Sequence, residues 1–331
     1  MNTIRFSLIR LWLWLLKGLS TDKADPADVY FSYRLLLGRE PDAPGWRNQL
    51  HALKRGRSRR EVVEGVINSP EYRSRNEPSE ITCVDVGRFA MWLDKEDNLI
   101  AQGIIATRAY EPHVTATLER ELTPESTFVD IGANMGWFTL LGAGLARRVI
   151  AIEPNHNNVQ LLYRSLLTNQ FTNVQVHECA VTDEPRLLEL NFLHSNGAVM
   201  AIGEMRESTT VVRGDSLDNL LRDVDHIDVM KMDIEGHEPV ALRGMVHILT
   251  HHRPVLLAEF HPMAIRAISN VEPEAFLRSL SDYGYRVSVI RHGGTEVGPL
   301  DVAGIISEWE NLNRKMNGQG TIHLDIICRP S

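Results

Sequence analysis

Apolar and polar positions follow two different patterns along the chain, and the change comes near residue 126. From there on, short and mainly apolar segments at residues 127–131, 149–152, 229–232 and 255–258 are separated by stretches with helical spacing. Apolar runs of this length are typical of strands that are buried on both faces. Alternation of such strands with helices predicts a parallel α/β sheet with helices on both faces.

The preceding part of the chain has the pattern of a small all-α domain, which we place at residues 21–79. Residues 29–37 and 46–53 carry helical apolar spacing, with turn residues rich in Gly and Pro between them. Ser58 followed by Glu61 is a capping-box pair, and it predicts a third helix that ends near Asn68.

Residues 80–125 bridge the two parts with a mixed pattern. Phe89, Met91 and Leu93 alternate as in a strand, so we expect a β-hairpin that turns at residues 94–98. A helix is expected at residues 112–122, and the α/β domain itself at residues 126–331.

The first 20 residues predict an amphipathic helix. Their uninterrupted apolar run, residues 11–16, is far shorter than the roughly 20 residues of a membrane span, and no small-residue cleavage site follows. Arg5, Arg10 and Lys17 are placed to reach lipid headgroups, which is typical of a helix lying in a membrane surface. The alternative is a helix that packs on the protein's own next domain.

Charge is unevenly divided along the chain. Residues 1–79 carry 14 Lys+Arg against 9 Asp+Glu, whereas the whole chain has a net charge of −8. The larger part therefore lacks the basic field that phosphates require, and we expect no nucleic-acid partner. The three cysteines form no CxxC pair, which indicates a reducing compartment. We expect a cytoplasmic protein, at the inner face of the cytoplasmic membrane if the first helix is an anchor.

A strand–turn–helix unit after residue 126 has the chemistry of a cofactor site. Asp130 lies near the end of the first strand, Gly132 and Gly136 form the turn, and Glu153 ends the next strand. Open parallel sheets bind ligands beyond the carboxyl ends of their strands, and glycines let the backbone approach a ligand closely.

Three cofactors compete for such a unit. A phosphate-binding P-loop requires Gly-Lys-Ser/Thr, but Trp137 follows Gly136. A dinucleotide fingerprint needs a glycine where Asn134 stands, and it would place pyrophosphate against Asp130. S-adenosylmethionine has a sulfonium and an amino group and no phosphate, so it suits this acidic strand end. Glu153 is placed to accept both hydroxyls of its ribose.

The same blocks resemble the FkbM family of S-adenosylmethionine-dependent methyltransferases. The segments that carry the resemblance are residues 128–136 (FVDIGANMG), 151–154 (AIEP), 181–183 (VTD), 216–218 (SLD) and 230–238 (MKMDIEGHE). Their order and spacing match over residues 100–328. The resemblance implies a Rossmann-like sheet of seven strands with the last one antiparallel, and O-methylation of a glycan, glycolipid or related hydroxylated acceptor.

A second resemblance concerns the small helical domain. Residues 33–42 (YRLLLGREPD), Gly45 and residues 69–72 (SPEY) are similar to a domain of unknown function. That domain often precedes enzymes of bacterial surface glycans.

The expected cofactor contacts come from the glycine turn and the strand ends, with adenine against the third strand at residues 174–180. The predicted set is Asp130, Gly132, Asn134, Gly136, Glu153, Pro154, Glu178, Ala180 and Asp233.

Methyl transfer to a hydroxyl also requires a base for the hydroxyl proton. The fourth strand is followed by Asp233, Glu235 and His237, and the fifth by Glu259 and His261. We expect these five residues around the acceptor. His261 is the first choice of base because histidine titrates near neutral pH, with Asp233 and Glu259 as alternatives. No ligand spacing fixes a metal, so none is expected.

Two other functions fit the sequence. One is methylation of a small secondary metabolite on oxygen or nitrogen, and the other is a non-catalytic adaptor in a surface-glycan assembly. The intact Asp130, Gly132, Glu153 and Asp233 argue against an inert site. Acceptor selection is expected from the connections at residues 192–208 and 292–317. The pattern specifies no oligomeric state.

Overall fold

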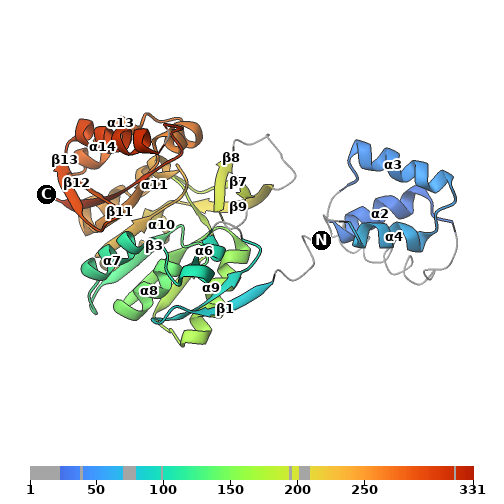
Figure 1. The fold of residues 1–331 in the computed structure, drawn as a ribbon, viewed down its shortest axis with the longest axis horizontal. Coiled ribbons are helices and arrows are strands. Elements are labelled where there is room, and N and C mark those ends of the chain that lie inside the picture. Colours follow the sequence, from blue (N-terminus) through green and yellow to red (C-terminus); the bar gives the residue numbers. More distant parts are fainter. Residues whose placement is uncertain are drawn as a thin grey trace. The chain divides into compact units, whose positions relative to one another are not determined.

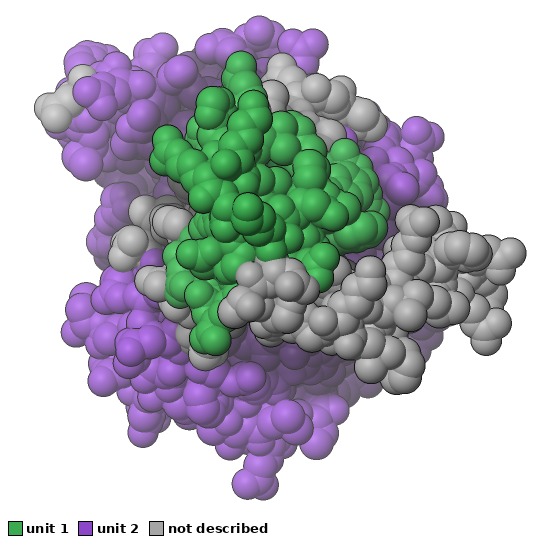
Figure 2. Space-filling view, turned by 90° about the vertical axis from the view of Figure 1, so that its right-hand side faces the viewer, with its two compact units in different colours: residues 1–79 green, residues 80–331 purple. Residues whose placement is uncertain are grey.

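The computed structural model describes residues 23–37, 40–69, 80–97, 100–193, 196–200, 209–316 and 318–331. It divides into two compact units, residues 1–79 and 80–331 (Figure 2). The predicted amphipathic helix of residues 1–20 and the segment at 70–72 lie outside the described residues. Within the described part, no helix is long and apolar enough to cross a membrane.

The described residues of the first unit form the helices α2 (Pro26–Leu36), α3 (Ala43–Lys54) and α4 (Arg59–Ile67). Ser58 and Glu61 form the predicted capping box, in which Ser58 Oγ accepts from the backbone N–H of Glu61 and the Glu61 carboxylate accepts from that of Ser58. Val29 of α2 and Val62 of α4 are fully buried. The helical prediction for this part is therefore confirmed.

The second unit is built on a mostly parallel sheet (Figure 1). Its strands are β3 (Thr127–Ile131), β4 (Arg148–Ile152), β5 (Val174–His177), β10 (Val229–Met232), β11 (Val255–Phe260), β12 (Tyr285–Ile290), β13 (Glu296–Leu300) and β14 (Leu324–Pro330). They lie in the order β13-β12-β14-β11-β10-β3-β4-β5, and β14 runs antiparallel to β11. The predicted fold is confirmed, with one strand more than expected. The addition is β13, an edge strand whose sequence, EVGPL, lacks a clear apolar alternation.

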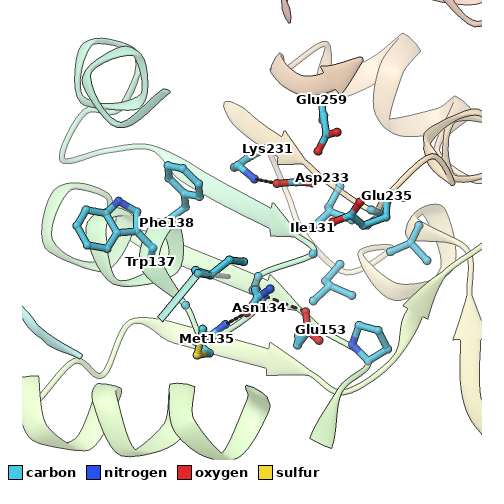
Figure 3. A pocket seen from close by; sticks show the side chains of 18 of the residues that line it. Ile131, Asn134, Met135, Trp137, Phe138, Glu153, Lys231, Asp233, Glu235 and Glu259 are labelled. Carbon is cyan, nitrogen blue, oxygen red and sulfur yellow. Dashed lines mark hydrogen bonds and ion pairs between the residues drawn. The ribbon is translucent and has the colours of Figure 1, made fainter. Parts of the chain in front are cut away.

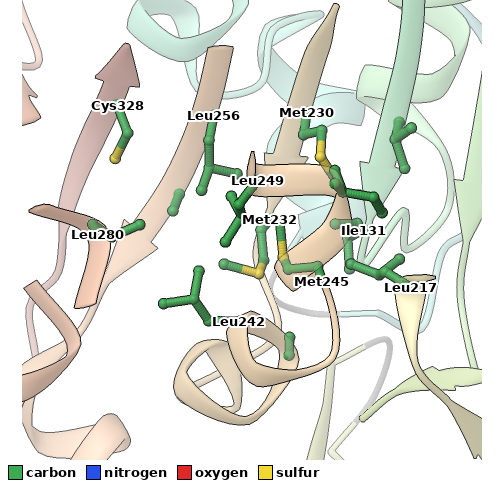
Figure 4. Packing of buried hydrophobic residues seen from close by; sticks show 14 of the residues in the cluster. Ile131, Leu217, Met230, Met232, Leu242, Met245, Leu249, Leu256, Leu280 and Cys328 are labelled. Atoms are coloured by element: carbon green, nitrogen blue, oxygen red, sulfur yellow. The ribbon is translucent and has the colours of Figure 1, made fainter. Parts of the chain in front are cut away.

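Two apolar layers cover the faces of this sheet. One contains α10 (Leu217–Leu220), α11 (Glu238–Arg243), α13 (Pro273–Asp282) and α14 (Val302–Lys315), with the π-helical turns Ile248–His252 and Ile265–Ser269 and the short α12 (Pro262–Ala264). Figure 4 shows Met230 and Met232 of β10 packed against Met245 and Leu249 in this layer. The other layer contains α6 (Ile100–Thr107), α7 (Pro112–Glu121), α8 (Trp137–Leu145) and α9 (His156–Asn169).

The bridge segment belongs to the second unit, and one prediction for it is wrong. The hairpin consists of β1 (Ile81–Asp85) and β2 (Ala90–Asp94), so it turns at residues 86–89 and not at 94–98. The Asp85 side chain accepts from the backbone N–H of Gly87, whose φ of +87° favours glycine. Asp97 instead caps α6 by accepting from the N–H of Ile100. The sequence analysis did not predict α6.

A second sheet emerges between β5 and β10. Its strands are β6 (Ala180–Val181), β7 (Arg186–Leu193), β8 (Asn196–Met200) and β9 (Thr209–Asp215), in the order β6-β9-β7-β8. The strand expected at residues 174–180 is thus divided near Glu178 between β5 and β6. This second sheet was not predicted.

Candidate active site

A cavity of about 360 Å³ opens at the carboxyl ends of β3, β4, β10 and β11. This is the edge at which open parallel sheets bind ligands. Most of the predicted site residues line it: Gly132, Asn134, Gly136, Glu153, Pro154, Ala180, Asp233, Glu235, His237, Glu259 and His261. Figure 3 shows Asp233, Glu235 and Glu259 gathered at one end, with Asn134 and Glu153 at the other.

The glycine turn forms the floor of the cavity between β3 and α8. Gly132 has φ of +80°, and a Cβ added there would lie 1.9 Å from the carbonyl oxygen of Asp233. A Cβ added to Gly136, where φ is +100°, would meet the side chain of Leu162 at 2.4 Å. Only glycine fits these two positions, so the turn leaves its backbone bare toward the cavity.

Glu153 holds this turn in place. Its Oε2 accepts from the backbone N–H of Asn134 at 2.8 Å, and its Oε1 accepts from the N–H of Asn155 at 2.9 Å. Oε1 also accepts from Asn158 Nδ2 at 3.2 Å, so the remaining acceptor capacity for a ligand hydroxyl is the second lone pair of Oε2. Burial raises the pKa of Glu153 to about 7, although these hydrogen bonds lower it.

Two predicted cofactor residues lie outside the cavity lining. Asp130 is fully buried, with Oδ2 accepting from the Thr139 hydroxyl at 2.6 Å, while Oδ1 has no hydrogen-bond partner in the described structure. Glu178 points to His156 Nδ1, which lies 3.0 Å from its Oε1. Asp130 therefore sits behind the turn and Glu178 beside it.

The opposite end of the cavity carries an acidic cluster around one lysine. Lys231 Nζ lies 2.9 Å from Asp233 Oδ2 and 4.5 Å from the centre of the Phe138 ring. Burial raises the pKa of Asp233, but the Lys231 charge together with hydrogen bonds from Glu259 and Lys231 outweighs this effect and holds the pKa at about 2. Burial and the Asp233 charge raise the pKa of Glu259 well above its usual range.

Two further carboxyl groups belong to this acidic cluster. Burial raises the pKa of Glu235 to about 7, and the Asp233 charge adds to the shift. Burial likewise raises the pKa of Glu111 to about 7, although the Lys231 charge opposes it. Glu111 and Glu235 both have left-handed backbones, with φ of 37° and 56°. A cavity with five carboxyl groups and a single lysine favours a cationic or neutral ligand over a phosphate.

Several lining residues were missed by the sequence analysis. Ile100 and Ile104 of α6, Tyr110, Glu111 and His323 all face the cavity, so the bridge segment supplies one of its walls. Lys231 carried a local signal, since a lone charge inside an apolar strand needs a partner. The others lie far from the recognised motifs, and no local pattern marks them.

The acceptor-selecting connections are only partly visible. From the first, residues 192–208, part lies outside the described residues; the adjoining Leu190 of β7 lines the cavity. From the second, Trp309 packs in the apolar core, and its Nε1 donates to the carbonyl of Ile322 at 2.9 Å. Across the described residues, no group of three or more His, Cys, Asp or Glu side chains is arranged to hold a metal ion.

Comparisons with known proteins agree with this geometry. Residues 130–287 match the family model of the methyltransferase FkbM domain, and residues 17–76 match DUF4214, a domain of unknown function. No curated protein matches the chain.

Two of the solved structures that resemble part of the chain are described as methyltransferases. A methyltransferase FkbM from Methylobacillus flagellatus KT is 16% identical with a TM-score of 0.40, over 90% of this chain and 58% of that one, so this chain spans less than two thirds of it. A putative methyltransferase from Streptococcus mutans in complex with SAH is 12% identical with a TM-score of 0.40, over 66% of this chain and 96% of that one. These likenesses are weak, and the two family models carry the assignment.

The predicted family is therefore confirmed, and the match agrees with S-adenosylmethionine as the cofactor. The chain carries an FkbM-family methyltransferase domain at residues 130–287, preceded by a DUF4214 domain at residues 17–76.

Proposed function

We propose that this protein transfers a methyl group from S-adenosylmethionine to a hydroxyl of a glycan, glycolipid or related acceptor. The observation that carries the proposal is the acidic cavity at the ends of β3, β4, β10 and β11, with its bare glycine turn. Phosphate cofactors would meet carboxylates there, whereas a sulfonium and an amino group are complementary to them.

The residues present fit this donor. Glu153 would hold the ribose hydroxyls, Pro154 and Ala180 would contact adenine, and the turn at Gly132 would pass beneath the amino-acid end. His237 supports the fit, because both its ring nitrogens are buried without a hydrogen-bond partner in the described structure. Such nitrogens are costly unless a ligand pairs them. The donor supplies an activated methyl group, and the chain's own part is to align the acceptor oxygen and take its proton.

The acceptor proposal rests on the resemblance and on electrostatics. Asp233 is ionised, and Glu111 and Glu235 titrate near pH 7, so an anionic acceptor would be repelled. A neutral sugar hydroxyl fits this field. A nucleic-acid acceptor does not, since its phosphates would meet the same carboxylates.

The first test is calorimetric titration with S-adenosylmethionine and S-adenosylhomocysteine. Glu153→Ala is expected to weaken binding about tenfold or more, because hydrogen bonds to a charged group contribute about 1.5–3 kcal/mol. Glu178→Ala is the matched control, and it should leave the affinity within about twofold. Absence of binding to the well-folded wild-type chain would contradict the methyltransferase proposal and favour an adaptor.

Acceptor class is then tested with methyl-labelled donor and a panel of neutral methyl glycosides, uronic acid glycosides and amines. Transfer to the neutral glycosides is the expected result. Transfer confined to amines would overturn the O-methyltransferase proposal and favour the small-molecule alternative.

We also propose that residues 1–20 bind a membrane surface. Deleting them should release the protein from anionic vesicles in a pelleting assay while S-adenosylhomocysteine affinity is retained. Equal pelleting of both forms would contradict the anchor.

A further inference from the structure

Three histidines line the cavity, and they differ in what their ring nitrogens do. His261 Nδ1 accepts from the backbone N–H of Ala264 at 3.2 Å, as the N-cap of α12. A neutral imidazole has one donor and one acceptor nitrogen. The proton of neutral His261 therefore sits on Nε2, so this ring offers the cavity a donor and cannot take a proton from an acceptor hydroxyl.

His323 reaches the same place from the far end of the chain. In the antiparallel pairing of β11 with β14, Phe260 lies opposite Leu324, so His323 comes beside His261 at the sheet edge. Its Nδ1 lies 3.4 Å from Oε1 of Glu259. Catalytic hydrogen bonds are often this long before substrate binds.

Glu259 can position the His323 ring by accepting a hydrogen bond from its Nδ1–H. Burial and the Asp233 charge raise the pKa of Glu259 well above the usual range, and its carboxyl group is hydrogen-bonded to that of Asp233. Two carboxyl groups can bond in this way only by sharing a proton. Lys231 holds Asp233 ionised at 2.9 Å. A neutral carboxylic acid that donates on one side retains an acceptor oxygen on the other, and Nδ1–H of His323 is the neighbouring donor.

We propose that His323 is the catalytic base of this site, with Glu259 as the residue that positions it, a proposal that rests on the proposed methyl transfer. Nε2 of His323 takes the acceptor's hydroxyl proton as the oxygen bonds to the methyl carbon and the carbon–sulfur bond breaks. The sulfonium charge thus ends on the His323 imidazolium, and the donor leaves as a neutral thioether.

Carboxyl groups and one histidine surround the His323 ring. Carboxyl groups reach it from the N-cap of α7 (Glu111), the end of β10 (Asp233), the following loop (Glu235) and β11 (Glu259), while the ring of His261 is the opposing neighbour. The other candidate bases are less suitable. Asp233 is a weak base because the Lys231 charge and the hydrogen bonds from Glu259 and Lys231 hold its pKa at about 2, and the Glu259 carboxyl group is already hydrogen-bonded to Asp233.

The test reads the two tautomers directly, by NMR on the full-length protein with nitrogen-labelled histidine, above the histidine titration range. His323→Asn and His261→Asn assign the two rings. We expect the proton on Nδ1 in His323 and on Nε2 in His261, and Glu259→Leu should shift His323 toward the Nε2–H form of free histidine. A proton on Nε2 of wild-type His323 would overturn the proposal.

Turnover gives an independent readout on the neutral methyl glycosides. His323→Asn should lower kcat about 10²–10⁴-fold with S-adenosylhomocysteine affinity within about twofold, while His261→Asn loses less than about tenfold. An active His323→Asn variant would overturn the assignment of the base. Failure of the wild type to bind S-adenosylhomocysteine would instead contradict the proposed function, so the two failures are distinguishable.

Discussion

Gly132 is packed so closely against the end of β10 that no side chain fits there. A Cβ at this position would lie 1.9 Å from the Asp233 carbonyl oxygen and 3.1 Å from Cγ2 of Ile234. Its φ of +80° adds the cost of a left-handed backbone for any other residue. The missing side chain thus keeps the ends of β3 and β10 together and leaves the cavity floor open.

Gly132→Ala is therefore expected to weaken S-adenosylhomocysteine binding about tenfold or more and to lower Tm. Backbone strain alone costs about 1–3 kcal/mol. Calorimetric titration and thermal unfolding of the full chain measure the two effects.

Gly103→Ala is the matched control. Nothing lies within 4 Å of a Cβ at this position of α6, and alanine in a helix is more favourable than glycine by about 0.5–1 kcal/mol. Tm values that move together in the two variants would show that Gly132 carries no steric constraint.

Glu235 gives the site a pH dependence of definite sign. Burial and the Asp233 charge raise its folded-state pKa from 4.5 to about 7. When a carboxyl group has a higher pKa in the folded state than in the unfolded state, its contribution to the free energy of unfolding is complete below the unfolded-state pKa. That contribution is lost as the pH rises through the folded-state pKa.

Glu235→Gln removes this loss, so the variant should gain stability relative to wild type between about pH 5 and about pH 8. Denaturant unfolding at the two pH values measures the gain. Glu310→Gln, on the exposed surface of α14, is the control. The difference in the free energy of unfolding between this variant and wild type should be the same at both pH values. A difference between Glu235→Gln and wild type that is the same at both pH values would contradict the shifted titration.

Helix α6 is the main difference between the predicted and the observed structure of the bridge segment, residues 80–125. It begins where Asp97 caps the N–H of Ile100, and it buries Ile104 against the cavity. Its neighbour Ile105 packs against the core beneath and does not line the cavity. Truncation to alanine removes the same atoms at both positions, but only the truncation of Ile104 removes a side chain that lines the cavity.

Ile104→Ala should therefore weaken S-adenosylhomocysteine binding several-fold more than Ile105→Ala. Ile104 is buried and Ile105 is partly buried, so either truncation costs at most about 2–5 kcal/mol of stability. Affinities are compared at a temperature where both variants are folded. Equal affinities would remove α6 from the binding wall.

Strands whose apolar residues and flanking charges are contiguous in the sequence could be predicted. Elements whose position depends on pairing with a distant strand could not. Residues 229–232 are apolar except for Lys231 and lie between Asp228 and Asp233, and β10 has those bounds. The hairpin was misplaced because both Gly87 and residues 94–98 carry turn chemistry, and cross-strand pairing decides between them. His323 was missed because the register that brings Leu324 opposite Phe260 joins segments over 60 residues apart.

At the scale of the whole molecule, every residue that lines the cavity belongs to the second compact unit, residues 80–331. The motifs that carry the family resemblance begin only at residue 128, so the sequence placed the cofactor domain at residue 126. The structure adds the bridge to the same unit, because α6 and α7 pack in the apolar layer with α8.

Removal of residues 1–79 should therefore leave S-adenosylhomocysteine affinity within about twofold of the full chain. Calorimetry on residues 80–331 measures this, and the Glu153→Ala change in the same background verifies that the site is the one described. An affinity that falls tenfold would show that the DUF4214 domain contributes to the pocket.

The second sheet has a consequence for how the enzyme can diversify. The chain leaves the main fold at Val181 and returns at Asp215, and these two residues are paired side by side in β6 and β9. The N–H of Thr182 donates to the carbonyl of Asp215 at 2.9 Å, which closes the junction. The insertion between Val181 and Asp215 therefore joins the main fold at one paired junction. Under the proposed methyl transfer, exchange of the segment between these two residues is expected to change the acceptor and to leave the residues at the carboxyl ends of β3, β4, β10 and β11 unchanged.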